Sequence, residues 1–113
     1  MKQIFKPQTE WLPPESFPDL SNYEEISIDL ETKDPGLKTK GSGSVTGEAH
    51  MVGVAVAVSD WKGYYPIRHE GGGNMDIKRV LKWFQDVLNT PAIKIFHNAM
   101  YDVCFIRSEG LKI

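Results

Sequence analysis

Apolar and polar residues alternate from residue 24 to residue 32, and this period of two predicts a β-strand with one apolar face. Residues 51–58 are a run of small and β-branched apolar residues, which predicts a buried strand. A turn-like stretch leads to a further predicted strand at 63–67, where Pro66 favours an edge position because proline lacks a backbone N–H. These last two strands are close enough in sequence to form a hairpin.

The period changes after Asn74, which we expect to cap a helix. Apolar residues then recur at helical spacing, at Ile77, Val80, Leu81, Phe84, Val87 and Leu88. This pattern predicts an amphipathic helix of about four turns. Pro91 marks its end.

The remaining sequence predicts a short strand at 93–97 and a second helix at 99–109, with Asn98 able to cap the helix and Gly110 following it. Residues 111–113 have the pattern of a strand that is beginning. The predicted order is β-β-β-α-β-α, so we expect an α/β fold built on a mixed sheet.

The N-terminal 22 residues contain four prolines and predict an irregular leader, followed by a domain at 23–113. Residues 33–50 predict a loop. Four apolar leader residues are candidates for pinning it onto the core: Trp11, Leu12, Phe17 and Leu20.

Composition narrows the possible function classes. A formal net charge of −2 argues against a strongly basic nucleic-acid module but not against a metal-dependent nuclease, whose site is rich in carboxylates. A lone Cys104 cannot form an internal disulfide, which favours a reducing compartment. The first eight residues show no secretory signal, and the longest apolar run is too short to cross a bilayer. We therefore expect a cytosolic protein with no membrane partner.

Asp29 and Glu31 lie two residues apart on the first predicted strand, so their side chains leave the same face, roughly 7 Å apart at the backbone. An apolar core cannot explain such a pair, whereas Mg²⁺ prefers oxygen ligands, and paired ions can clamp a phosphodiester. The plainer interpretation is a strand with one solvated face. Asp102 follows the strand at 93–97, in the first turn of the second helix, where it either complements the helix N-terminus or approaches the other two carboxylates.

The two segments together resemble a known family. Residues 28–32 (Ile-Asp-Leu-Glu-Thr) look like the first motif of the DEDD 3′–5′ exonucleases, and residues 98–102 (Asn-Ala-Met-Tyr-Asp) look like the second. Residues 29–38 and 61–74 are similar to bacteriophage family A DNA polymerases, and the resemblance extends over about 24–113. It implies a ribonuclease H-like fold and two-metal hydrolysis of DNA 3′ ends for proofreading, in the host cytoplasm.

The resemblance also implies roles for individual residues. Asp29 would bridge two Mg²⁺ or Mn²⁺ ions, Glu31 would ligate one of them, and Asp102 would support the second. The implied partners are the 3′ end of single-stranded DNA and the remainder of the exonuclease and polymerase chain. Residues implied near the substrate are Leu30, Thr32, Asn98 and Tyr101.

One departure from the family is large. Its third motif, a Tyr or His four residues before a final Asp, is absent, so we expect a sheet incomplete at its C-terminal side and little nuclease activity from this chain alone. Two alternatives remain open: a non-catalytic binding or structural piece, and a ribonuclease D-like RNA exonuclease. The spacing of the three histidines does not support a zinc site. Four aromatic residues are candidates for base stacking, although core packing or a hairpin surface is favoured for at least three of them: Trp61, Tyr64, Tyr65 and Trp83.

Overall fold

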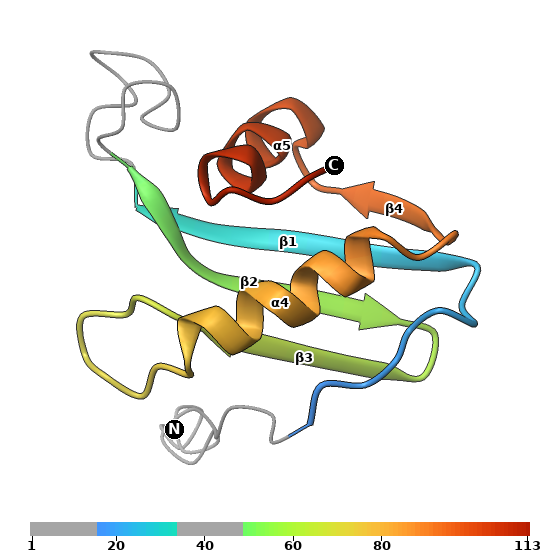
Figure 1. Cartoon of the computed structure of the whole chain (residues 1–113), viewed down its shortest axis with the longest axis horizontal. Helices are drawn as coiled ribbons and strands as arrows, with labels where there is room; N and C mark the ends of the chain where they lie inside the picture. Colours follow the sequence, from blue (N-terminus) through green and yellow to red (C-terminus); the bar gives the residue numbers. More distant parts are fainter. Residues whose placement is uncertain (1–15, 34–48) are drawn as a thin grey trace, which may run out of the picture.

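The structure, a computed structural model, describes residues 16–33 and 49–113. Its elements follow the predicted order. They are β1 (Glu25–Lys33), β2 (His50–Val58), β3 (Trp61–Pro66), α4 (Ile77–Leu88), β4 (Ile93–Phe96) and α5 (Ala99–Ser108). The strands form one four-stranded sheet in the order β3-β2-β1-β4 (Figure 1). The predicted mixed α/β architecture is confirmed.

Strand β1 is central and pairs differently on its two sides. It is antiparallel to β2, with Asp29 opposite Ala55, and parallel to β4, with Ile28 opposite Phe96. The β2–β3 hairpin is confirmed, and so is the edge position of β3, which contains Pro66. The register of β1 against β2 shifts between Glu31 and Thr32.

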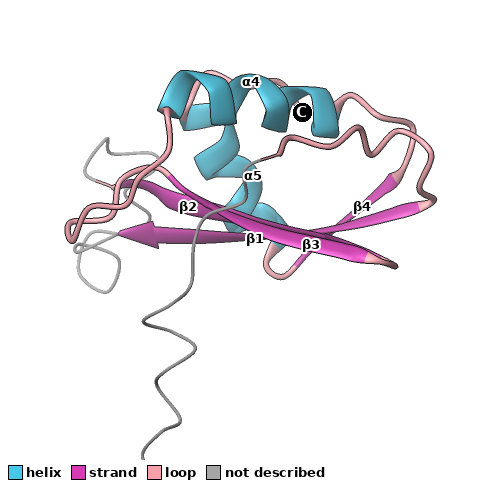
Figure 2. Ribbon diagram, turned by 90° about the horizontal axis from the view of Figure 1, so that it is seen from below, coloured by secondary structure: helices cyan, strands magenta, loops and turns pink. Residues whose placement is uncertain are grey.

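Both helices cover the same face of the sheet (Figure 2). The apolar side chains of β1 point toward them, as the period of two requires, and Ile26 and Ile28 are buried. Each fully buried large apolar side chain contributes about 1.5–3 kcal/mol. The helices supply Val80, Trp83, Phe84, Val87, Phe105 and Ile106 to this core.

The described part of the leader lies against α4 and β3. The Phe17 ring is 5.3 Å from that of Tyr65 and 5.9 Å from that of Trp83. The Trp83 indole N–H donates to the Pro18 carbonyl at 2.8 Å, and the Tyr65 hydroxyl donates to the Ser16 carbonyl at 2.7 Å. These contacts confirm that the described part of the leader, from Ser16 onward, is pinned to the core.

The same region contains a buried leader residue and a cluster of three aromatic rings. Leu20 is buried in the core, as expected, whereas Trp11 and Leu12 lie outside the described residues. The rings of Trp61, Tyr65 and Trp83 contact one another, which confirms core packing for these three aromatic residues.

Two local predictions are wrong. The cap of α4 is Asp76, whose side chain accepts from the Lys78 N–H, because the Asn74 side chain is bonded to the backbone N–H and carbonyl of His69 instead. Residues 111–113 form no strand, because the backbone of Lys112 hydrogen-bonds to the side chain of Gln85 on α4. Gly110 does follow α5 with a φ of 85°, the left-handed conformation expected after a helix.

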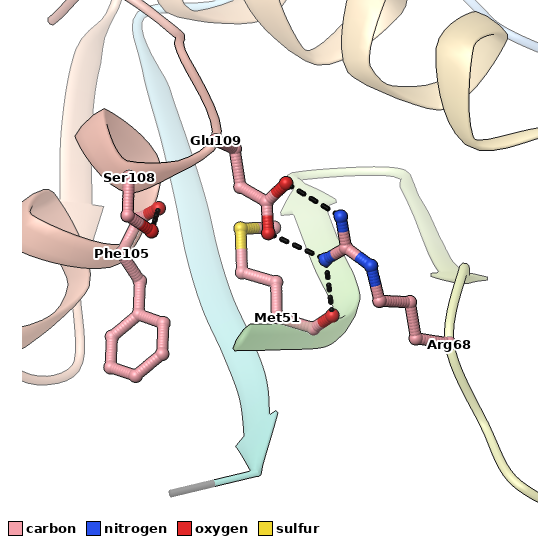
Figure 3. Close-up of polar contacts among 5 residues, drawn as sticks. All are labelled: Met51, Arg68, Phe105, Ser108 and Glu109. Carbon is pink, nitrogen blue, oxygen red and sulfur yellow. Dashed lines mark hydrogen bonds and ion pairs between the residues drawn. The ribbon is translucent and has the colours of Figure 1, made fainter. Parts of the chain in front are cut away.

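An arginine joins three separate segments near the end of α5. Figure 3 shows the Arg68 guanidinium between the Glu109 carboxylate and the Met51 carbonyl. The two nitrogen–oxygen distances to Glu109 are 2.5 and 2.8 Å, and the distance to the Met51 oxygen is 2.9 Å. Arg68 therefore fixes the C-terminal end of α5 against the start of β2.

Candidate active site

Asp29 and Glu31 project from β1 on the sheet face that carries no helix, and both are exposed. The neighbouring positions on β2 are small: Ala55 lies opposite Asp29, and Gly53 lies opposite Glu31. The alternation of β1 places the two carboxylates on the same face, as the sequence predicted.

Asp102 reaches the same region from α5. The parallel pairing of β1 with β4 brings the start of α5 to the end of β1 at which Asp29 lies. Asp102 is only 4% exposed, and its Oδ2 accepts a hydrogen bond from the Asn98 N–H at 3.3 Å. Among the described residues, it is the only polar or charged residue that is buried.

The surroundings of Asp102 disfavour its charge. Desolvation is the main cause that raises the pKa of the Asp102 carboxyl, and the negative charge of Asp29 raises it further. The hydrogen bond from Asn98 and the nearby His97 act in the opposite direction. Asp29 and Asp102 therefore lie within electrostatic reach of each other, although they are far apart in sequence.

The Glu31 carboxylate is turned toward β3. Its Oε1 accepts a hydrogen bond from the Tyr64 hydroxyl at 3.0 Å, and its Oε2 lies 3.9 Å from Nε2 of His69. The Tyr64 hydroxyl is also 2.6 Å from Nε2 of His69. Sequence reasoning weighed Tyr64 for base stacking and for packing, but it did not place Tyr64 beside Glu31. The signal that it missed is the glycine at position 53, which leaves space above β2 beside Glu31.

The four residues predicted to lie near the substrate have different surroundings in the structure. Thr32 Oγ1 and the Tyr101 hydroxyl are 3.0 Å apart, so β1 and α5 are linked beside the carboxylates. The Tyr101 ring also packs on Phe105, with 4.8 Å between the ring centres. The Leu30 side chain packs against the core, and Asn98 is exposed at the N-cap of α5 with no side-chain capping bond.

The three carboxylates do not gather into one group. Within residues 16–33 and 49–113, no three His, Cys, Asp or Glu side chains are arranged so that they could hold a metal ion. Asp29 and Asp102 influence each other, whereas Glu31 is engaged by Tyr64 and His69. This part of the chain therefore presents acidic side chains on one region of the sheet without forming a closed cation site.

A hollow of about 720 Å³ lies on the helix-free face beside Asp29. Its floor includes small residues of the two inner strands, β1 and β2. Larger side chains from β3 and from the end of β4 form its sides. The residues that define it include Ser27, Asp29, Ala55, Lys62, Tyr64 and His97.

No protein-family model matches the chain. A comparison with curated proteins finds a DNA-directed DNA polymerase of Pseudomonas phage M6, which is 31% identical over 114 residues. The chain is distantly homologous to a phage DNA polymerase. The alignment covers 92% of this chain but 16% of that polymerase, so the chain spans about a sixth of its relative's length. In the described part of the chain, no helix is long and apolar enough to cross a membrane.

Proposed function

We propose that the chain is the N-terminal portion of the proofreading 3′–5′ exonuclease region of a phage DNA polymerase, with a ribonuclease H-like fold. The observation that carries this proposal is the electrostatic proximity of Asp29 and Asp102. The parallel pairing of β1 and β4 brings the two carboxyls within electrostatic reach across a large sequence separation, and Asp29 lines a hollow on the open sheet face. The homology to a phage DNA polymerase supports the same assignment.

In this proposal, Asp29, Glu31 and Asp102 are carboxylate ligands for Mg²⁺ or Mn²⁺, the hard cations that prefer oxygen. The substrate is the 3′ end of single-stranded DNA. It would lie near the linked pair Thr32 and Tyr101, with the Leu30 backbone and Asn98 close by. The working compartment is the cytoplasm of the infected host.

The remainder of the polymerase chain is the proposed partner. It would supply the fourth carboxylate and the residue that orients the attacking water, which the family's third motif provides and this sequence lacks. The chain by itself should therefore cleave DNA very slowly or not at all. Purified chain should leave 3′-labelled single-stranded DNA intact; metal-dependent digestion that Asp29→Ala abolishes would overturn this part of the proposal.

The cation site is tested by titrating Mn²⁺ into the isotope-labelled chain and following paramagnetic broadening by NMR. Broadening should centre on Asp29 and Asp102, and both Asp29→Asn and Asp102→Asn should weaken it. Asp86→Asn is the matched control, because Asp86 is an exposed aspartate on α4. Scattered broadening that Asp29→Asn does not alter would contradict the proposed ligands.

A second candidate function is a non-catalytic piece of a polymerase that binds other parts of the chain. The absence of a three-ligand group within the described residues favours it. The two candidates differ in the Mn²⁺ titration, since a well-dispersed spectrum with no localised broadening is the result expected of a non-catalytic piece. The homology to a phage DNA polymerase favours DNA over the RNA substrate of a ribonuclease D-like enzyme.

A further inference from the structure

The side chain of Glu31 is exposed, yet its carboxylate has a defined set of neighbours. Tyr64 on β3 donates its hydroxyl hydrogen to Oε1 at 3.0 Å. A phenol has a single hydrogen to donate, so the 2.6 Å contact with His69 requires His69 to donate from Nε2 to the phenol oxygen. The chain of bonds then runs from His69 through Tyr64 to Glu31. The His69 ring also stands edge-on to the Tyr64 ring, with 5.7 Å between the ring centres.

Gly53 makes the reach of Tyr64 possible. It lies on β2, directly opposite Glu31, between the strands that carry the two partners. A Cβ atom at position 53 would lie 2.1 Å from the Tyr64 hydroxyl oxygen and 2.4 Å from the adjacent ring carbon. Its φ is not positive, so the glycine is required for space and not for backbone conformation.

The backbone next to Glu31 also limits the directions that its side chain can take. The register of β1 against β2 shifts directly after Glu31, and such irregularities re-aim side chains next to functional sites. Thr32, on the other side of the shift, bonds to Tyr101 on α5. Glu31 and Thr32 are thus held from opposite faces of the sheet.

We propose that Tyr64 is a positioning residue for Glu31, that His69 braces the phenol, and that Gly53 provides the space. The proposal rests on the proposed function in one respect, the role of Glu31 as a cation ligand. Partners that hydrogen-bond a ligating carboxylate fix its orientation, and removal of such a partner typically lowers metal affinity 10- to 100-fold. Tyr64 acts through Glu31 and does not itself contact the cation.

The first test compares Tyr64→Phe with Tyr23→Phe in the whole chain. Tyr23 is a matched control because its hydroxyl also donates to a carboxylate, Oδ1 of Asp60, at 2.6 Å. The readout is the ¹³C resonance of the Glu31 side-chain carboxyl. Tyr64→Phe should shift this resonance and broaden the range of Glu31 side-chain torsions, while Tyr23→Phe leaves both unchanged. An unchanged Glu31 resonance in Tyr64→Phe would overturn the positioning role.

Gly53→Ala provides an independent second variant. It keeps the Tyr64 hydroxyl but removes the space that the phenol occupies, so it should shift the Glu31 resonance as Tyr64→Phe does. If the Glu31 resonance moves in Tyr64→Phe but not in Gly53→Ala, the proposed role of Gly53 is wrong.

Mn²⁺ affinity separates this inference from the proposed function. If the unaltered chain binds Mn²⁺ near Asp29, Tyr64→Phe should weaken that binding about tenfold. Unchanged Mn²⁺ affinity in Tyr64→Phe would show that the positioning of Glu31 by Tyr64 does not contribute to cation binding. If the unaltered chain shows no localised Mn²⁺ binding, the proposed function fails, and the Glu31 resonance still decides whether Tyr64 positions the carboxylate.

Discussion

Breaking the contact between Arg68 and Glu109 should loosen α5, the helix that carries Asp102. Arg68 follows β3, Glu109 caps the C-terminus of α5, and the guanidinium also bonds to the Met51 carbonyl at the start of β2. The informative perturbations are Arg68→Met, Glu109→Gln and the double variant. Together these three variants isolate the interaction from the effect of each side chain alone.

The burial of the two side chains sets the size of the effect. Glu109 is 9% exposed and Arg68 is 31% exposed, so water screens this pair less than a surface ion pair. Exposed pairs contribute about 0.2–1 kcal/mol, whereas a hydrogen bond to a charged group contributes about 1.5–3 kcal/mol. With two such bonds and partial screening, we expect a coupling of about 1–2 kcal/mol. For a domain of roughly this size, that corresponds to a loss of about 5–10 °C in Tm.

The assay is urea unfolding of the four proteins, followed by circular dichroism, at low and high salt. The coupling should persist in salt because the pair is partly buried. The exposed pair of Lys33 and Glu70 serves as the control and should show no measurable coupling in the matching cycle. A coupling for Arg68 and Glu109 below about 0.3 kcal/mol, within the usual error of additivity, would refute the argument.

Three further variants test the core, the leader and the candidate site. Phe84→Ala removes a fully buried ring and should cost about 3–5 kcal/mol in urea unfolding; a cost below 1 kcal/mol would contradict its core position. Trp83→Phe removes the donor to the Pro18 carbonyl and should cost about 1 kcal/mol, with increased hydrogen exchange confined to residues 16–20. Burial raises the pKa of the Asp102 carboxyl. The charged carboxylate therefore lowers the free energy of unfolding only when the pH is above the ordinary aspartate pKa of about 4. Asp102→Asn should therefore raise Tm at neutral pH, with a gain that disappears at pH 3; an equal gain at both pH values would contradict this cause.

The alternation along residues 24–32 was sufficient to place the first two candidate carboxylates. A strand with one buried face cannot shift its register without moving Ile26 and Ile28 out of the core, so Asp29 is fixed on the opposite face. The strand-to-helix junction at Asn98 likewise predicted where α5 begins. The parallel pairing of β4 with β1, which the sequence left open, is what brings Asp102 near Asp29.

The cap of α4 and the direction of the Glu31 side chain depend on contacts with residues outside each of these elements. Asn74 and Asp76 are both good capping residues, and the choice between them depends on the backbone of His69, to which Asn74 bonds. The direction of the Glu31 side chain depends on a glycine and a tyrosine on two other strands, so no pattern within β1 could predict it.

The order of the strands has a consequence for the time course of folding. The central strand β1 comes first in the described part of the chain, but its parallel partner β4 follows about 70 positions later, with Glu25 opposite Ile93. At synthesis rates of about 5–20 residues per second, the edge of β1 that pairs with β4 would stay unpaired for roughly 4 to 14 s until β4 is synthesised. An unpaired strand edge is open to association with other chains during that interval. The segment that closes this edge also leads directly into α5, so Asp29 would be in place well before Asp102 joins it.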